Sequence, residues 1–122
     1  MPRSRDGHDL AAPSAAQQMT TRTRIEHLMH ACGGLREAAD VLGTTTATLA
    51  RWRAGHAAPD PHDLQVLVDL DWLVGRLVLR AAPPAAVVAW LRAPCPALDG
   101  AHPLELVRTG GVATVVAALE AD

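Results

Sequence analysis

Apolar residues recur every three or four positions along most of this chain, and glycine or proline interrupts each such run. This spacing places apolar side chains on one side of an α-helix, whereas a strand needs alternation at every second residue. Ala, Leu and Val supply most of the apolar residues, which suits helices that pack closely. The sequence therefore predicts an all-α fold. Its 122 residues allow one domain, or two small subdomains that share a core.

Glycine, proline and threonine positions set the expected helix boundaries. We expect helices over roughly 23–31, 35–42, 45–53, 62–82, 84–91, 103–107 and 112–119. Residues 1–20 have no helical periodicity and read as a flexible arm. The predicted organisation is an N-terminal arm over residues 1–21, a helix-turn-helix region over 22–58, and a C-terminal helical region over 59–122.

The longest predicted helix, over 62–82, is apolar around most of its circumference. Its polar side chains fall on one narrow strip, formed by Gln65, Asp69, Arg76 and Arg80. A helix with so wide an apolar arc must bury two sides, one against its own domain and one against something else. Asp71 falls on the apolar arc and is expected at a buried or interface position. Gly75 weakens a helix relative to alanine, so we expect a close helix–helix approach there.

The overall composition excludes several classes of protein. The net charge is −2 and 49% of the residues are apolar, so a wholly disordered chain is disfavoured. Residues 64–91 carry charges and a double proline, and are too interrupted to span a bilayer. With two cysteines and no apolar leader, the expected state is a reduced, cytoplasmic protein that does not enter a membrane.

Residues 37–52 have the pattern of a DNA-reading helix-turn-helix. Two helices crossing steeply need a small residue at their contact, and Ala39 supplies it. The turn needs a residue that tolerates positive φ, which Gly43 provides. Leu49 and Trp52 are spaced to anchor the second helix in the core. This combination predicts DNA binding, with a purely structural helical hairpin as the alternative.

The first residues of the second helix would enter the major groove. We expect base-edge contacts from Thr45, Thr46, Ala47 and Arg51, and contacts nearer the backbone from Thr48 and Arg53. Arg51 is the best candidate for specificity, because arginine can pair bidentately with guanine. Residues 22–53 sum to a charge of +2, against −4 for residues 54–122. Because one copy has few cations to contact phosphates, we expect a homodimer that reads two half-sites of operator DNA.

Residues 90–111 form a second motif, a proline-braced turn between two helices. It contains Trp90, Leu91, Pro94, Pro96, Leu98, Gly100, Pro103, Glu105, Leu106, Thr109 and Gly110. Joined to the preceding helix-turn-helix, this motif resembles the Xre/MbcA/ParS family of antitoxins, which pair a Xre-like DNA-binding half with a toxin-binding half. The resemblance covers about residues 22–120.

The resemblance implies the antitoxin of a type II toxin–antitoxin pair, which is not itself an enzyme. The implied partner is a RES-domain toxin that consumes NAD or transfers ADP-ribose from it, with the complex repressing its own promoter. Residues 90–109 would form the toxin-binding scaffold and residues 112–122 the end that blocks the toxin's cleft. The implied toxin contacts are Trp90, Pro94, Leu98, Pro103, Leu106 and Arg108. Glu120 and Asp122 are interpreted as an acidic plug for a basic NAD site.

Other functions have less support from the sequence. His27, His30 and Cys32 are close in sequence, but no fourth ligand accompanies them, and structural zinc usually takes four. Neither a phosphate-binding loop nor a nucleophile with a neighbouring base is evident, so no catalytic residue, metal or cofactor is expected. The alternative function is a helix-turn-helix repressor whose C-terminal half dimerises or binds a ligand.

Overall fold

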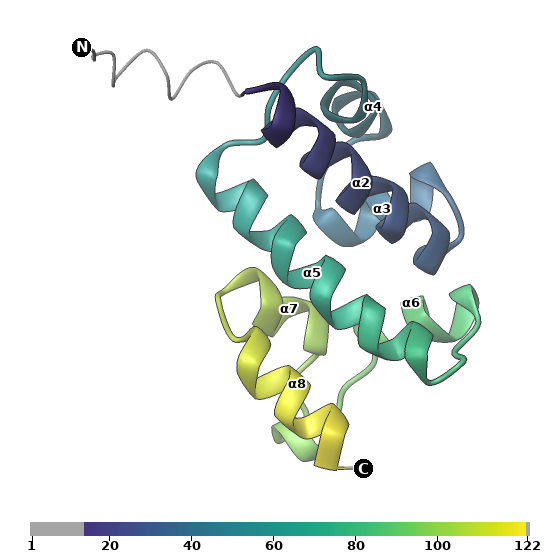
Figure 1. Cartoon of the computed structure of the whole chain (residues 1–122). Helices are drawn as coiled ribbons and strands as arrows, with labels where there is room; N and C mark the ends of the chain where they lie inside the picture. The colour runs from purple at the N-terminus through teal and green to yellow at the C-terminus, as the bar shows by residue number, and fades with distance from the viewer. Residues whose placement is uncertain (1–13, 122) are drawn as a thin grey trace.

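The computed structural model describes residues 14–121, which form seven α-helices, one short 3₁₀ helix and no strand (Figure 1). The elements are α2 (Ala15–Cys32), α3 (Leu35–Leu42), α4 (Thr46–Ala54), α5 (Pro61–Leu79), α6 (Pro84–Arg92), η1 (Pro96–Leu98), α7 (Pro103–Arg108) and α8 (Val112–Ala121). The predicted all-α fold is confirmed. No helix in this part of the chain is long and apolar enough to cross a membrane.

Helix α2 begins at Ala15, so the expectation that the helix starts near Thr23 was wrong. The Ser14 hydroxyl accepts the Gln17 N–H at 3.1 Å, and the Gln17 side chain accepts the Ser14 N–H at 2.8 Å. This capping box starts a helix without any apolar periodicity. Residues 15–21 are therefore helical rather than part of an arm, while residues 1–13 lie outside the described range.

Helices α3 and α4 form where the sequence predicted them. Gly43 ends α3 with φ of 77° and donates its N–H to the Asp40 carbonyl at 3.1 Å. Thr45 caps α4 by accepting the Thr48 N–H, and Gly55 ends it with φ of 80°. Glycine adopts this left-handed conformation without the strain that a Cβ would add. Local cap chemistry thus fixes both ends of the turn between α3 and α4.

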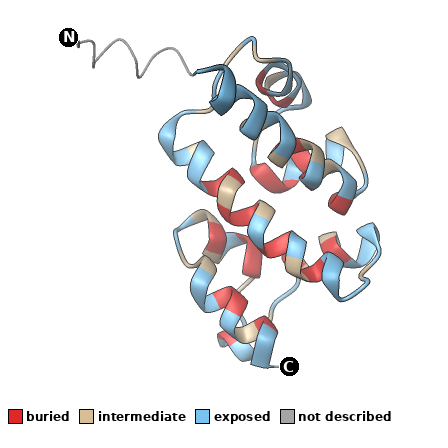
Figure 2. Ribbon diagram, in the orientation of Figure 1, coloured by how far each residue is buried: buried red, intermediate tan, exposed pale blue. Residues whose placement is uncertain are grey.

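Helix α5 is the central element and packs against α2, α3, α6, α7 and α8. It lies between α2–α4 on one side and α7–α8 on the other (Figure 1). Buried side chains from all seven helices form one apolar cluster, visible as the red segments that face the interior in Figure 2. Leu67, Leu70 and Leu73 are fully buried, and each contributes about 2 kcal/mol of transfer free energy. Both halves of the chain therefore share one core.

Two expectations for α5 were wrong. The helix ends at Leu79 rather than at Ala82, since Ala81 has φ of 60° and Pro83 follows. Gly75 makes no close helix–helix contact within the chain, because a Cβ built there would meet no atom within 4 Å. The predicted polar strip also does not all face solvent: Asp69 is buried and accepts a hydrogen bond from Gln65 at 2.9 Å.

Candidate functional sites

Helix α4 has one face in the core and one face in solvent. Leu49 and Trp52 are buried against the rest of the fold, as predicted, while Thr46, Ala47 and Arg51 are exposed. Within residues 14–121, the Arg51 guanidinium forms no ion pair. The exposed side chains at the start of α4 and on its outer face are therefore accessible to an anionic ligand such as DNA.

The other three predicted DNA contacts have local partners. The Thr45 hydroxyl accepts the Thr48 N–H at 3.1 Å and donates to the Thr48 hydroxyl at 3.0 Å, so both side chains serve the α4 cap. Arg53 donates to the Glu26 carboxylate of α2 at 3.3 Å. These three side chains help to hold α4 in place, whereas those of Thr46, Ala47 and Arg51 are exposed to solvent.

Glu26 is the charged link between α2 and α4. Arg22 donates to the Glu26 carboxylate at 3.2 Å, and this hydrogen bond, with a second from Arg53, holds the pKa of Glu26 below its usual value. The side chains are substantially exposed, so the pair is screened and contributes little stability. The pair holds the Arg53 guanidinium against α2 in the free chain, and the predicted contact of Arg53 near the DNA backbone stays a prediction.

The C-terminal motif forms the turn from α6 through η1 to α7. The Cys95 N–H donates to the Ala101 carbonyl at 3.0 Å, and the Gly100 N–H donates back to the Cys95 carbonyl at 2.9 Å. Leu98 and Pro103 are buried under this turn. The two backbone hydrogen bonds close the turn, and the two apolar side chains fasten it to the core.

The predicted toxin contacts of the motif differ in how accessible they are. Leu98 and Pro103 are buried, Trp90 and Leu106 are half-buried, and Pro94 is exposed. A buried side chain cannot touch a partner without local unfolding. The motif therefore marks mainly the residues that shape the turn, and only its exposed members can contact a toxin directly.

Arg108 links the C-terminal half to the helix-turn-helix. Its Nη2 donates to the carbonyls of Asp40 at 3.0 Å and Val41 at 2.8 Å, both in the last turn of α3. A cation at this end of a helix pairs with unsatisfied carbonyls and with the negative end of the helix dipole. The structure thus places Arg108, predicted to contact a toxin, against α3, where it braces the two halves.

Helix α8 is held on α5 by two arginines. The Glu120 carboxylate pairs with Arg76, and Arg80 donates to the Leu119 carbonyl at 2.8 Å. Glu120 is therefore paired within the chain, although its side chain stays partly exposed. Asp122, the other residue of the predicted acidic plug, lies outside the described residues.

Sequence reasoning missed a polar link across α2 and α5. Asp71 of α5 lies 3.6 Å from Arg24 and 3.3 Å from His27 of α2, measured between carboxylate oxygens and the nearest side-chain nitrogens. Asp71 on an otherwise apolar arc was the available signal, but the sequence does not show which residues of another helix lie opposite it. The pair holds α2 against α5 beside an open apolar face.

Comparisons with known proteins identify the C-terminal half. Residues 75–121 match the family described as the antitoxin Xre/MbcA/ParS C-terminal toxin-binding domain. These residues run from the second half of α5 to the end of α8, and include the proline-braced turn. The all-helical fold with this matched region defines a toxin-binding antitoxin of a toxin–antitoxin system.

The matched domain, residues 75–121, belongs to the Xre/MbcA/ParS antitoxin family, as the motif in residues 90–111 indicated. Curated relatives named mycobacterial cidal antitoxin MbcA, from Mycobacterium tuberculosis and Mycobacterium bovis, are 28% identical over 85 residues. The match covers 70% of this chain and 74% of each relative. No solved structure gave a significant match.

Proposed function

We propose that this chain neutralises a RES-domain, NAD-consuming toxin and represses its own operon through α4. The observation that carries the proposal is the match of residues 75–121 to a toxin-binding domain, together with a separate, exposed α4 face. The two surfaces lie at different ends of the molecule (Figure 1). One chain can therefore hold toxin and DNA at the same time.

The toxin-contacting surface in this proposal is the exposed side of the α6–α8 region. Pro94 is exposed, and Trp90 and Leu106 are each partly exposed. Glu120 can exchange Arg76 for a cationic group of the toxin at small cost, because an exposed ion pair contributes about 0–1 kcal/mol. An acidic C-terminal end suits the basic pocket that binds a pyrophosphate.

Operator binding in this proposal uses the start of α4. Thr46 and Ala47 lie in the first turn of that helix and Arg51 lies on its exposed side, the positions from which a recognition helix reads the major groove. Arg51 can donate to guanine O6 and N7, and a threonine can contact a base edge or a thymine methyl group. One copy offers few cations, so tight binding needs a second copy.

The test of toxin recognition is co-expression with the reading frame adjacent to the gene. If that frame encodes the proposed toxin, it lowers cellular NAD and arrests growth alone, and the wild-type antitoxin restores both. A non-toxic neighbour that forms no complex would overturn the antitoxin–toxin pairing and leave a stand-alone repressor as the better account.

The test of operator recognition is Arg51→Ala, assayed by mobility shift on the DNA upstream of the gene. We expect a loss of about 1–3 kcal/mol in operator affinity. Toxin binding and thermal stability should be unchanged, since Arg51 is exposed. Arg92→Ala, which removes an exposed arginine from α6, is the matched control. Equal operator binding by both variants would show that α4 does not read DNA.

A further inference from the structure

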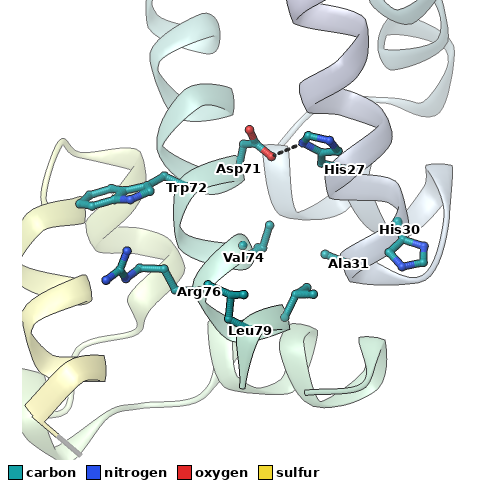
Figure 3. A pocket seen from close by; sticks show the side chains of 10 residues that line it. His27, His30, Ala31, Asp71, Trp72, Val74, Arg76 and Leu79 are labelled. Carbon is teal, nitrogen blue, oxygen red and sulfur yellow. Dashed lines mark ion pairs between the residues drawn. The ribbon is translucent and has the colours of Figure 1, made fainter. Parts of the chain in front are cut away.

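Two polar links join elements that lie far apart in the sequence, and they differ in what they hold. Asp71 of α5 pairs with His27 of α2 beside an open groove of about 430 Å³, as the dashed line in Figure 3 shows. The His27 side chain is 63% exposed, so water screens this pair. Arg108 of α7 instead donates to two backbone carbonyls of α3, and the shorter of these hydrogen bonds is partly buried. This second link acts on the backbone at a helix end, and it therefore holds that end in position.

The carbonyls that Arg108 holds belong to the turn that leads into α4. The Asp40 carbonyl accepts from Arg108 Nη2 at 3.0 Å and also from the Gly43 N–H at 3.1 Å. The guanidinium lies against Gly43 itself, because a Cβ built there would be 3.3 Å from Arg108 Nη2. Only residues 43–45 separate the end of α3 from the start of α4. Arg108 therefore contacts the turn that sets where α4 begins.

This contact leaves part of the Arg108 guanidinium unsatisfied. Its Nε is buried and has no hydrogen-bond partner among the residues that the structure describes. A buried donor without an acceptor lowers stability, and such a group in a folded protein calls for an explanation. The buried Asp69 and Arg108 line the same cavity of about 240 Å³, yet no hydrogen bond joins them within residues 14–121. Arg108 is thus directed at α3 rather than at the buried carboxylate in its own cavity.

The angle of α4 at this turn decides where its exposed side chains lie. A recognition helix presents its base-contacting residues from one face, so its direction has to be fixed. Arg51 follows Thr46 by five residues, which is about 7.5 Å along the helix axis. A tilt of about 10° at the turn would displace Arg51 by about 1.3 Å, whereas a binding site tolerates only about 0.5 Å. A small change at the end of α3 is therefore enough to misplace Arg51.

The salt bridge that links α4 to α2 acts at the opposite end of α4. Arg53 lies in the last turn of α4 and pairs with Glu26 of α2. Their side chains are 42% and 40% exposed, and an ion pair so exposed holds its partners weakly. The start of α4 therefore depends on the turn from α3, where Arg108 donates its hydrogen bonds.

We propose that Arg108, although it lies in the matched toxin-binding domain, is a positioning residue for operator recognition. It holds the turn between α3 and α4 at the angle from which α4 reads DNA, and it acts through the carbonyls of Asp40 and Val41 without touching DNA. The inference rests on the proposed operator binding. It adds that the DNA-reading half depends on a side chain from residues 75–121. The unpaired Nε follows from this role, because the guanidinium serves the geometry of the turn.

Operator binding by the purified full-length chain tests the proposal. Mobility shifts use the DNA upstream of the gene, at a temperature where circular dichroism shows every variant to be folded. Arg108→Ala should raise the operator Kd at least about fivefold. Arg92→Ala removes an exposed arginine from the same matched domain and should bind like wild type.

Two comparisons separate positioning from a loss of stability and from a lost phosphate contact. Leu98→Ala removes a buried side chain of η1 and destabilises the fold, but it should bind operator like wild type while folded. The slope of log Kd against log salt concentration should be equal for Arg108→Ala and wild type. An arginine that itself contacts a phosphate would change that slope by about one.

The tryptophan indole N–H signals report the position of α4 in the absence of DNA. Trp52 belongs to α4 and is 7% exposed, so its signal depends on how α4 packs on the core. In NMR spectra of the ¹⁵N-labelled chain, Arg108→Ala should shift the Trp52 signal. The signal of Trp72, which lies on α5 beside Arg76 (Figure 3), should stay in place as the reference. Arg92→Ala should move neither of these two signals.

The inference fails if Arg108→Ala binds operator as tightly as wild type, or if folded Leu98→Ala loses as much operator affinity. It also fails if the salt slope changes by about one, or if the Trp52 signal does not move. The failure of the proposed operator binding is a different result. A wild-type chain that does not bind the upstream DNA overturns both proposals, whereas equal binding by wild type and Arg108→Ala overturns only the role of Arg108.

Discussion

The helix-turn-helix and the toxin-binding domain place their recognisable residues differently. In α3–α4 the motif residues divide between two faces, with Leu49 and Trp52 in the core and Thr46 and Arg51 in solvent. In the region from α6 to α7, the predicted toxin contacts are buried or half-buried, with the exception of Pro94. The first motif therefore names both buried anchors and exposed candidate contacts, whereas the predicted contacts of the second motif serve chiefly as scaffold.

The two halves also depend on each other. Arg108, from the toxin-binding domain, hydrogen bonds to carbonyls at the end of α3. Buried side chains of both halves pack on α5 within one apolar cluster. The proposed division into two functions thus applies to the surface, while both halves share one interior. Variants at exposed and at buried positions test whether surface effects can be separated from core effects.

The largest expected effect comes from a buried residue of the C-terminal motif. Leu98→Ala should lower the free energy of unfolding by about 2–5 kcal/mol, because Leu98 is 8% exposed and its removal leaves a cavity. Toxin binding should fall only through this loss of fold. Pro94→Ala, an exposed motif position, should leave the Tm nearly unchanged in the same thermal melt. Full stability of Leu98→Ala would remove the scaffold interpretation of the motif.

The two cysteines allow the accessibility of the two halves to a thiol reagent to be compared. Burial raises the pKa of Cys32 from 9.0 to about 11, which cuts its thiolate fraction at pH 8 roughly a hundredfold. Cys95, in the motif turn, is partly exposed and should react with a disulfide reagent first. Because folding disfavours the Cys32 thiolate, stability should also decline as the pH rises from 9 toward 11. Mass spectrometry after timed labelling checks the order, and faster labelling of Cys32 would contradict it.

Arg108→Ala measures the link between the halves. We expect a loss of about 1.5–3 kcal/mol in stability, because two α3 carbonyls lose a charged donor that holds them at 2.8–3.0 Å. Arg92→Ala, on the exposed side of α6, should change stability by less than about 0.5 kcal/mol. Chemical denaturation of both variants gives the comparison. If the two arginines prove equivalent, the halves are joined by apolar packing alone.

The sequence predicted best where a single residue decides the local structure. Gly43 and Gly55 end α3 and α4, and Pro103 starts α7, as expected. The start of α2 was missed because a capping box between Ser14 and Gln17 needs no apolar periodicity. Helix boundaries are therefore predictable from the sequence where glycine or proline sets them. They are harder to predict where a pair of polar side chains sets them.

The candidate contacts were harder to predict than the fold. Exposure depends on which helix covers which face, and this is a property of the tertiary arrangement. Arg108 was predicted to contact the toxin because of its place in the motif. In the structure its guanidinium instead donates to a carbonyl of α3. Gly75 was expected to mark a close approach of two helices, but no helix of this chain fills the position. Spacing alone identifies such residues without identifying their partners.

The most direct test of the central claim is a neutralisation assay that separates the two surfaces. The toxin is co-expressed with wild type, Arg51→Ala, or a chain lacking residues 112–122, and growth and cellular NAD are followed. We predict full rescue by wild type and Arg51→Ala, and no rescue by the shortened chain. Rescue by the shortened chain would contradict the account, because the C-terminal helix would then be dispensable for blocking the toxin.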